Sequence, residues 1–403
     1  MIRKPLLGYL VSHPIQYQAP LFRRLAASDK IDFVALFGSD FGLQPSYDSQ
    51  FGCVVDFGID LLSGYQSIFI NQASRQPAID RFFGLRTPSI HTALKAKPLD
   101  VLILHGWRTA MMWQAALGAI LRGIPYLMRA ETPEFRSNRS PMRLQQQIRN
   151  FAVKSLVRRA AGLLALGAAN ERFYLRMGCA PERMFRVPYF VDNTAVATAA
   201  ATGRANRREI RATLGIPNDK FVVVAVAKLI QRKRPLDLVQ ALKALPADIH
   251  LVWVGTGPLE EQLRAEAKVL NVEDRLHLAG FRPARETWTI LGASDLFALP
   301  SQNEPWGLVI NEAVAAGLPA LVTDQCGGAE DLVVPDRTGE IVNTGDIAAW
   351  INAIRKWYQR YQAKDILDQQ EIRRRADLHC IEQAALSLEN ITLAVNDQGG
   401  TAK

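Results

Sequence analysis

The stretch that decides the fold is Leu296-Phe297-Ala298-Leu299-Pro300-Ser301-Gln302-Asn303-Glu304-Pro305-Trp306-Gly307-Leu308-Val309-Ile310-Asn311-Glu312. Its first four residues are apolar and predict a buried strand that ends at Pro300-Ser301. The loop that follows turns into a helix, since Pro305 suits the first helical position and Gly307 leaves the backbone open. A strand, a loop and a helix in this order are typical of an α/β fold with a parallel sheet, whose ligands bind beyond the carboxyl ends of the strands.

Glu304 and Glu312 lie eight residues apart in this stretch. Because a helix turns about 100° per residue, Glu312 returns to within about 80° of Glu304, roughly two turns further along. The two carboxylates can then line one side of an elongated ligand such as a nucleotide sugar, although a solvated helix face shows the same spacing. A diphosphate would meet the unpaired N–H groups of the first turn, where the helix dipole favours negative charge. These N–H groups belong to Trp306, Gly307, Leu308 and Val309.

Apolar strands and amphipathic helices alternate in both halves of the chain, which predicts two Rossmann-like domains with parallel sheets. The predicted strands are 6–11, 31–37, 101–104, 125–128, 163–166 and 184–187, then 221–227, 250–254, 276–279, 296–299 and 320–323. Residues 194–206 are rich in Ala and Thr and have little core potential. We therefore predict an N-terminal domain at 1–193, a linker and connecting helix at 194–215, and a C-terminal domain at 216–375. Residues 376–403 are expected to cross back to the first domain and to end in a disordered tail from Gln398.

The composition is that of an ordinary globular protein, with 48% apolar and 22% charged residues in a chain of 403. That length suffices for two domains with full cores. The four cysteines form no C-x2-C pair, so neither a zinc site nor a disulfide framework is predicted, and a reducing cytosol fits. The apolar run near the start is too short for a signal peptide, and no run reaches the roughly 18 apolar residues of a membrane span.

Positive charge is concentrated in the first half of the chain. Up to Asp192 there are 24 Lys and Arg against 13 Asp and Glu, whereas the remainder has 24 against 26. No acidic residue lies between Glu134 and Glu171, and residues 136–159 predict a basic amphipathic helix. This helix either packs on the sheet as an ordinary surface helix or attaches to an anionic membrane surface or a lipid-diphosphate acceptor. No nucleic-acid-binding motif accompanies the charge, so nucleic acid is not expected as a partner. The residues expected on its apolar face are Leu144, Ile148, Phe151, Ser155, Leu156 and Val157.

The stretch from Glu304 to Leu332, with Gly317-Leu318-Pro319 and Gly327-Gly328-Ala329-Glu330, resembles the donor site of the retaining glycosyltransferases of family 4. The resemblance spans almost the whole chain, but its specific motifs are concentrated in residues 220–335. It implies the GT-B architecture, in which two Rossmann-like domains face a central cleft. It also implies that Glu304 is a catalytic residue beside the transferred sugar and that Glu312 holds the nucleotide ribose.

Further residues of the second half resemble this donor site. Val226-Ala227-Lys228-Leu229-Ile230-Gln231-Arg232-Lys233 is similar to the family's Gly-Arg-Leu-x-x-x-Lys-Gly motif, whose two cations neutralise the donor diphosphate. Lys228 replaces the arginine and keeps its charge but not its bidentate fork. Lys233 matches the lysine, which implies a catalytic role as the sugar leaves, although residues 232–234 could also form a solvated basic turn. Gly280-Phe281-Arg282 matches the position where the family accommodates the base, and so adds Phe281 and Arg282 to the donor site.

The first half carries the implied acceptor side. Leu104-His105-Gly106-Trp107 resembles the family's strand ending in His-Gly, so that His105 either faces the transferred sugar as a catalytic residue or is a structural histidine. Ser12-His13-Pro14-Ile15-Gln16-Tyr17 lacks the family's glycine pair and resembles a bacterial subgroup, which implies a loop that shapes acceptor specificity. Arg129-Ala130-Glu131 also resembles this subgroup, but an ion pair that holds a loop is an equally good interpretation. The expected acceptor-side residues are His13, Gln16, Tyr17, Arg129 and Glu131.

The resemblance implies a retaining glycosyltransferase that moves a hexose from a nucleotide-diphosphate-sugar to a glycan or lipid-linked acceptor in surface polysaccharide biosynthesis. The chain has no Asp-x-Asp, so cationic side chains and a helix N-terminus are expected to stabilise the leaving group. Neither a metal nor a cofactor is expected, and the protein would be cytoplasmic, or peripheral on the inner face of the cytoplasmic membrane. Two other classes stay open: a nucleotide-sugar isomerase or epimerase, and a non-catalytic binding protein that uses the basic first domain.

Overall fold

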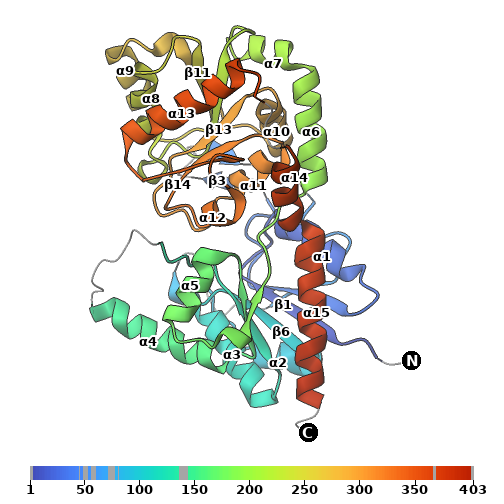
Figure 1. Cartoon of the computed structure of the whole chain (residues 1–403). Coiled ribbons are helices and arrows are strands. Elements are labelled where there is room, and N and C mark those ends of the chain that lie inside the picture. Colours follow the sequence, from blue (N-terminus) through green and yellow to red (C-terminus); the bar gives the residue numbers. More distant parts are fainter. Residues whose placement is uncertain are drawn as a thin grey trace.

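The structure, a computed structural model, describes residues 3–44, 46–48, 53–55, 60–70, 78–79, 81–135, 144–365 and 369–400. Figure 1 shows two α/β domains, one above the other, with the last helix running beside the lower, first domain. Each domain is built on one parallel sheet, with seven strands in the first and six in the second. The two predicted Rossmann-like domains are thereby confirmed.

The sheet of the first domain has the strand order β5-β2-β1-β6-β7-β8-β9. Its strands are apolar along their length because helices cover both faces. One face packs on α2, α3, α4 and α5, and the other packs on α1 and α15. The strands are β1 (Leu6–Val11), β2 (Asp32–Phe37), β5 (Ser67–Phe69), β6 (Val101–His105), β7 (Tyr126–Arg129), β8 (Gly162–Ala165) and β9 (Met184–Arg186). The helices are α1 (Gln18–Ala26), α2 (Ile90–Ala96), α3 (Ala110–Arg122), α4 (Leu144–Arg159), α5 (Ala168–Arg176) and α15 (Ile381–Gly400).

The sheet of the second domain has the order β12-β11-β10-β13-β14-β15. The predicted strand Leu296–Leu299 is β13, and it pairs with β10 and β14. The loops after β10 and β13 therefore meet where the strand order reverses, which is where ligands bind in open α/β sheets. The other strands are β10 (Phe221–Val226), β11 (Ile249–Val254), β12 (Leu276–Gly280), β14 (Ala320–Thr323) and β15 (Gly339–Val342). The helices are α8 (Pro235–Lys243), α9 (Glu260–Val269), α10 (Ala284–Gly292), α11 (Leu308–Ala315), α12 (Ala329–Leu332), α13 (Ile347–Gln362) and α14 (Gln369–Leu378).

The Ala/Thr-rich segment, which we expected to have little core potential, is helix α6 (Asn193–Ala205), and α7 (Arg207–Thr213) follows it. Its small residues let α6 approach α10 closely. A Cβ at Gly203 would lie 2.0 Å from the carbonyl oxygen of Thr289, and a Cβ at Gly292 would lie 2.0 Å from that of Ala200. The segment therefore contributes to the core through small residues, as two tightly packed helices require.

Helix α15 leads the chain back to the first domain, where it packs on α1 (Figure 1). It continues to Gly400, so the predicted disordered tail is helical from Gln398 to Gly400, and residues 401–403 lie outside the described part. Within the described ranges, no helix has both the length and the apolar character that crossing a bilayer needs.

The predicted basic helix corresponds in part to α4. The described helix begins at Leu144, and residues 136–143, with their three arginines, lie outside the described residues. Val153, Leu156 and Val157 are buried against the sheet, as expected for a surface helix. Phe151 does not belong to this apolar face, because 78% of it is exposed.

Candidate active site

Glu304 lies in the loop between β13 and α11 and not on the helix. Helix α11 begins at Leu308, and Gly307 precedes it with a φ of 91°, in the left-handed region. A Cβ at Gly307 would also meet Ile310 Cδ1 at 2.9 Å. The prediction that Pro305 opens the helix is therefore wrong, and the helical angle between the two glutamates does not apply.

A neighbouring loop holds Glu304 in place. The Glu304 N–H donates to the Gln325 carbonyl oxygen at 2.9 Å, and the Gly327 N–H donates to the Glu304 carbonyl oxygen at 3.0 Å. A Cβ at Gly327 would lie 1.9 Å from the Pro305 carbonyl oxygen. Only glycine permits this approach, so Gly327 of the predicted glycine pair serves to fix the Glu304 loop.

Two cations from the loop after β10 hold the Glu304 carboxylate. Lys233 Nζ contacts Glu304 Oε2, and Arg232 Nη1 lies 3.1 Å from the same oxygen. The side chains of Lys233 and Glu304 are only 13% and 11% exposed, so water and salt screen this pair little. Sequence analysis placed Arg232 in a basic turn and did not assign it to the site. We call Glu304, Lys233 and Arg232 the second-domain cluster.

The start of α11 lies a few residues after Glu304 of this cluster. The N–H groups of Leu308 and Val309 have no hydrogen-bond partner among the residues that the structure describes. They point out of the helix N-terminus, where the dipole attracts a diphosphate. Lys228 is half-buried and lies just after the end of β10, the strand that pairs with β13. The structure thus brings together most of the predicted diphosphate-binding residues.

The side chain of Trp306 lies at the contact between the two domains. Its side chain is 3% exposed, its indole N–H donates to Asn311 Oδ1 at 2.7 Å, and its ring stacks on Tyr189 with centroids 5.7 Å apart. Since Tyr189 follows β9, this stack joins the two domains. The Trp306 side chain is therefore a domain contact, and the predicted role of the Trp306 main-chain N–H in diphosphate binding stays a prediction.

The base-binding candidates lie at the end of β12. Phe281 is half-buried, whereas Arg282 is exposed. Arg282 Nε donates to the Ala279 carbonyl oxygen at 3.0 Å, and its guanidinium lies 3.4 Å from Glu286. Both residues follow a strand at the same edge of the sheet as Lys228, and their role stays a prediction.

The surroundings of Glu312 disfavour the ionised form of its carboxylate. Burial raises its pKa to about 7, and the nearby Trp288 indole offsets this only in part. The Trp288 Nε1–H lies near this carboxylate and has no other partner within the described chain. Ribose hydroxyls would supply further donors and favour the ionised form.

Glu312→Gln should therefore stabilise the ligand-free protein at high pH. The folded-state pKa exceeds the unfolded value of 4.5, so wild-type stability falls as pH rises from about 4.5 to 7 and stays reduced above that. At about pH 8 the variant should gain on the order of 1 kcal/mol, and at about pH 5 almost nothing. Thermal denaturation at both values measures this. Glu261→Gln, at an exposed position of α9, is the control, and equal melting temperatures of Glu312→Gln and wild type at high pH would contradict the expectation.

In the first domain, five side chains converge at the carboxyl ends of the strands. Glu131 Oε1 accepts hydrogen bonds from Tyr17 at 2.9 Å, from Tyr189, and from His105 Nε2 at 3.2 Å. His105 Nδ1 lies 2.9 Å from both Tyr9 Oη and Gln18 Nε2. Both ring nitrogens of His105 thus have protein partners. We call Glu131, His105, Tyr17, Tyr189 and Gln18 the first-domain cluster.

In this cluster, the hydrogen bonds to the Glu131 carboxylate all go to one of its two oxygens. Its Oε1 is saturated by three donors, whereas its Oε2 has no partner among the described residues, and 35% of the side chain is exposed. Burial works to raise the pKa of Glu131, but the hydrogen bond and charge of His105, with the bonds from Tyr189 and Tyr17, lower it to about 2. An ionised oxygen is therefore presented at neutral pH.

The other acceptor-side candidates are arranged around this cluster. His13 bonds Ser12 Oγ at 2.8 Å, and burial followed by the charge of His105 lowers the pKa of His13 to about 4, so that it is neutral at pH 7. Gln16 is half-buried in the same loop. Arg129 is 2% exposed, donates to the Val187 carbonyl oxygen at 3.3 Å and lies over the Tyr189 ring. No ion pair between Arg129 and Glu131 is found in the described chain. The Arg129 guanidinium instead packs on the face of the Tyr189 ring, 5.4 Å from its centroid.

The two clusters are linked through the domain interface. Tyr189 bonds Glu131 with its hydroxyl group and stacks on Trp306 with its ring. Asp331, which follows the glycine pair, accepts from the Ala168 N–H at 2.9 Å and pairs with Arg186 at 3.1 Å. Sequence analysis missed Tyr189 as a site residue, although its position just after a predicted strand pointed to the ligand-binding edge. In the described part of the chain, no three His, Cys, Asp or Glu residues form a metal-binding group.

Two family profiles match the chain. Residues 206–374 match the Glycosyl transferases group 1 family, and residues 72–189 match the Glycosyl transferase 4-like domain. The chain is 28% identical over 276 residues to the UDP-Gal:alpha-D-GlcNAc-diphosphoundecaprenol alpha-1,3-galactosyltransferase of Escherichia coli, which covers 66% of this chain and 68% of that protein. It is 31% identical over 177 residues to the D-inositol 3-phosphate glycosyltransferase of Xylanimonas cellulosilytica, covering 43% of this chain and 42% of that protein. The fold is similar to that of Anabaena HepE in complex with UDP, with a TM-score of 0.67, 18% identity and 99% of each chain covered.

Proposed function

The chain belongs to the group 1 glycosyltransferases, and from that premise we propose that it transfers a hexose from a nucleotide-diphosphate-sugar to a glycan or lipid-linked acceptor with retention of configuration. The observation that carries the proposal is the second-domain cluster beside the open N-terminus of α11. Two cations, one carboxylate and unpaired N–H groups at one edge of a parallel sheet match a diphosphate joined to a sugar.

The leaving diphosphate is stabilised by protein groups in this proposal. In the ligand-free protein, Lys233 and Arg232 neutralise Glu304. A bound diphosphate would share Lys233, while Lys228 and the N–H groups of Leu308 and Val309 take the other oxygens. The reaction needs no metal under this arrangement, because fixed positive groups already lie where negative charge develops. Glu304 then orients the sugar, and the acceptor hydroxyl attacks the face from which the diphosphate leaves.

We assign the acceptor hydroxyl to Glu131 Oε2. The Glu131 side chain is 35% exposed, and three donors hold its carboxylate by the other oxygen. With a pKa of about 2 it is a weak base, so it orients the hydroxyl by accepting its hydrogen bond, and the departing diphosphate takes the proton. His105 acts as a positioning residue, since Nε2 donates to Glu131 and Nδ1 lies within hydrogen-bond distance of Tyr9 Oη and Gln18 Nε2.

Glu131→Gln should reduce transfer to the acceptor about 10- to 100-fold and leave nucleotide affinity unchanged. The amide oxygen of the glutamine can still accept hydrogen bonds from the two tyrosines, so the cluster is kept. The position of Oε2 is then taken by an NH₂ group, which cannot accept a hydrogen bond from the acceptor hydroxyl and carries no negative charge. Transfer rates and calorimetry with UDP measure the two effects. Glu134→Gln, in the same loop and paired with Arg176 at 3.0 Å, is the control. Unchanged transfer by Glu131→Gln would remove Glu131 from the acceptor site.

The classes of donor and acceptor follow from the relatives. The Escherichia coli relative is named for UDP-galactose and a diphosphoundecaprenol acceptor, and the Anabaena structure contains UDP. We therefore propose a UDP-hexose as donor, a lipid-diphosphate-linked glycan as acceptor, and a place at the inner face of the cytoplasmic membrane. The basic segment 136–159 fits this location, although residues 136–143 lie outside the described ones.

The proposed reaction is tested by following UDP release from UDP-hexoses in EDTA, with and without undecaprenyl-diphosphate-linked N-acetylglucosamine. We expect release that depends on the acceptor and a product with the α-configuration of the donor. Conversion of the UDP-sugar without an acceptor would identify an isomerase or epimerase instead. Release that requires an added divalent cation would overturn the metal-independent part of the proposal.

A further inference from the structure

Phe41 is an exposed aromatic side chain at the ligand-binding edge of the first sheet. It lies in the loop that follows β2, and β2 pairs in parallel with β1. The loops after these two strands therefore meet at the carboxyl ends of neighbouring strands, where open α/β sheets bind ligands. Of the Phe41 surface, 50% is exposed. A single exposed phenylalanine is ordinary, so its surroundings decide whether it has a ligand.

The loop that carries Phe41 is fixed against the loop after β1. The Gly38 N–H donates to the carbonyl oxygen of the last residue of β1 at 3.1 Å, and the Phe41 N–H donates to Ser39 Oγ at 3.1 Å. Gly42 has a φ of 86°, in the left-handed region, and a Cβ there would lie 3.5 Å from the Pro14 carbonyl oxygen. These contacts hold Phe41 in place before a ligand arrives, so binding has little left to order.

His13 connects Phe41 to the first-domain cluster. The two rings meet edge-to-face, with centroids 5.3 Å apart and planes at 79°. Burial, followed by the charge of His105, lowers the pKa of His13 to about 4, so His13 lies near His105 and is neutral at pH 7. His105 in turn contacts Glu131, the residue that we assign to the acceptor hydroxyl. We call Phe41 and His13 the aromatic pair, and it belongs to the acceptor side of the site.

The aromatic pair suits an uncharged ring and not a phosphate group. Neither ring is charged at neutral pH, so covering them costs little desolvation. The loops at 12–17 and 38–44 contain no Lys or Arg that would hold a phosphate. The face of a phenyl ring is negative, whereas the flat side of a pyranose presents C–H groups with a small positive charge, so the two stack favourably.

We propose that Phe41 and His13 form a subsite that stacks on a pyranose ring of the acceptor, while Glu131 holds the hydroxyl group that reacts. The inference rests on the proposed function and adds Phe41 as a residue that selects the acceptor. A lipid chain is the other candidate occupant, but a chain would need only apolar area at this position and not the face of an aromatic ring.

The test is calorimetric titration of N-acetylglucosaminyl diphosphate, with a short alkyl group in place of undecaprenol, into the full-length protein saturated with UDP. Phe41→Ala and Phe41→Leu should each weaken binding of this probe by about tenfold or more, because both remove the aromatic face. Phe41→Trp keeps that face and should bind within about threefold of the wild type. Since half of Phe41 is exposed, the three variants should fold, and each should keep the affinity for UDP.

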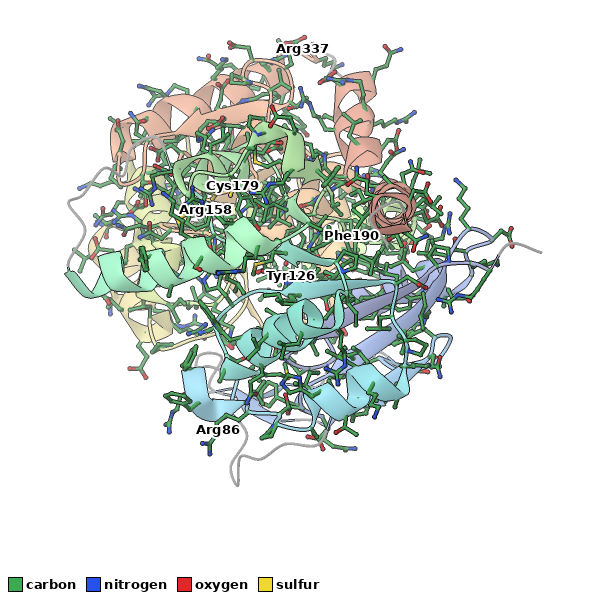
Figure 2. All side chains as sticks on the ribbon, turned by 90° about the horizontal axis from the view of Figure 1, so that it is seen from below. Arg86, Tyr126, Arg158, Cys179, Phe190 and Arg337 are labelled. Atoms are coloured by element: carbon green, nitrogen blue, oxygen red, sulfur yellow. The ribbon has the colours of Figure 1, made fainter. Side chains whose placement is uncertain are left out.

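Phe151→Ala is the matched control. Phe151 is 78% exposed on α4, the helix on the outer side of the first domain that carries the labelled Arg158 in Figure 2. This variant should bind the probe like the wild type. No binding of the probe by the wild type, or equal binding by Phe41→Ala, would overturn the proposal. Wild-type binding by Phe41→Leu would show that apolar area alone is needed and would overturn it too.

Release of UDP from a UDP-hexose, measured with the same probe as acceptor, separates this inference from the proposed function. Release with an unchanged probe affinity in Phe41→Ala would keep the transfer reaction and remove the subsite. Probe binding that depends on Phe41, without any release of UDP, would keep the subsite and contradict the transfer reaction.

Discussion

Glu304→Ala should lower sugar transfer by about a thousandfold or more, which corresponds to roughly 4 kcal/mol of transition-state stabilisation. Two effects combine. The substitution removes the carboxylate that we place beside the transferred sugar, and it releases Lys233 and Arg232 from the position in which Glu304 holds them. The protein should stay folded, because the loop is fixed by main-chain bonds to Gln325 and Gly327 that the substitution leaves intact. Initial rates of UDP release with acceptor measure the loss.

The matched control is Glu340→Ala. Glu340 is also a largely buried carboxylate of the second domain, with 17% of its side chain exposed, and it pairs with Lys356 at 2.6 Å. It lies on β15, at the edge of the sheet. This variant should lose some stability but should transfer at the wild-type rate. Transfer by Glu304→Ala within about tenfold of the wild type would show that Glu304 has no role in the reaction.

Lys233→Ala should weaken UDP binding by about 30- to 100-fold, since a charge-assisted hydrogen bond to phosphate contributes roughly 2–3 kcal/mol. The Lys233 side chain is 13% exposed and contacts Glu304, so it already lies in a poorly solvated place close to the N-terminus of α11. Without Lys233, only Arg232 still pairs with the Glu304 carboxylate. The negative charge of Glu304 is then less well neutralised and repels the diphosphate. Titration calorimetry with UDP in EDTA gives the affinity.

Uridine, which has no diphosphate, serves as a second ligand to test whether Lys233 acts on the diphosphate of UDP. If Lys233 acts on the diphosphate, Lys233→Ala should bind uridine like the wild type and lose affinity only for UDP. Lys356→Ala removes a cation that pairs with Glu340 at 2.6 Å, away from the site, and serves as the control. Equal UDP affinity of Lys233→Ala and the wild type would contradict the assignment of this lysine.

The central strands of both sheets were predictable, because a strand buried on both faces is a run of apolar residues. β13 and β10 are such runs. The edge strands β5 and β15 were not predicted, since each is only three or four residues long and partly exposed. Helix α6 was missed for a different reason. Its Ala, Thr and Gly residues suggest a weak core, but the close approach to α10 depends on their small size, and no sequence pattern shows which partner they meet.

The donor half of the site was predictable from local motifs, whereas its geometry was not. Glu304, Lys233 and the Gly307 turn occur together in the structure, but Pro305 does not begin the helix, and the Trp306 side chain faces the first domain. Each of these differences depends on contacts with distant loops, such as the one between Pro305 and Gly327. The first-domain cluster also joins residues far apart in the sequence, from Tyr17 to Tyr189, so its hydrogen bonds could not be derived from spacing.

The central claim is a nucleotide-sugar site built from the second-domain cluster, the start of α11 and Glu312. Its most direct test is a thermal-shift panel in EDTA with UDP-, GDP- and ADP-linked hexoses and with the bare nucleotides, on the wild type and on Glu312→Ala. We predict a selective rise in melting temperature with one UDP-hexose, absent in the variant. No rise with any nucleotide sugar, or an equal rise in Glu312→Ala, would contradict the account.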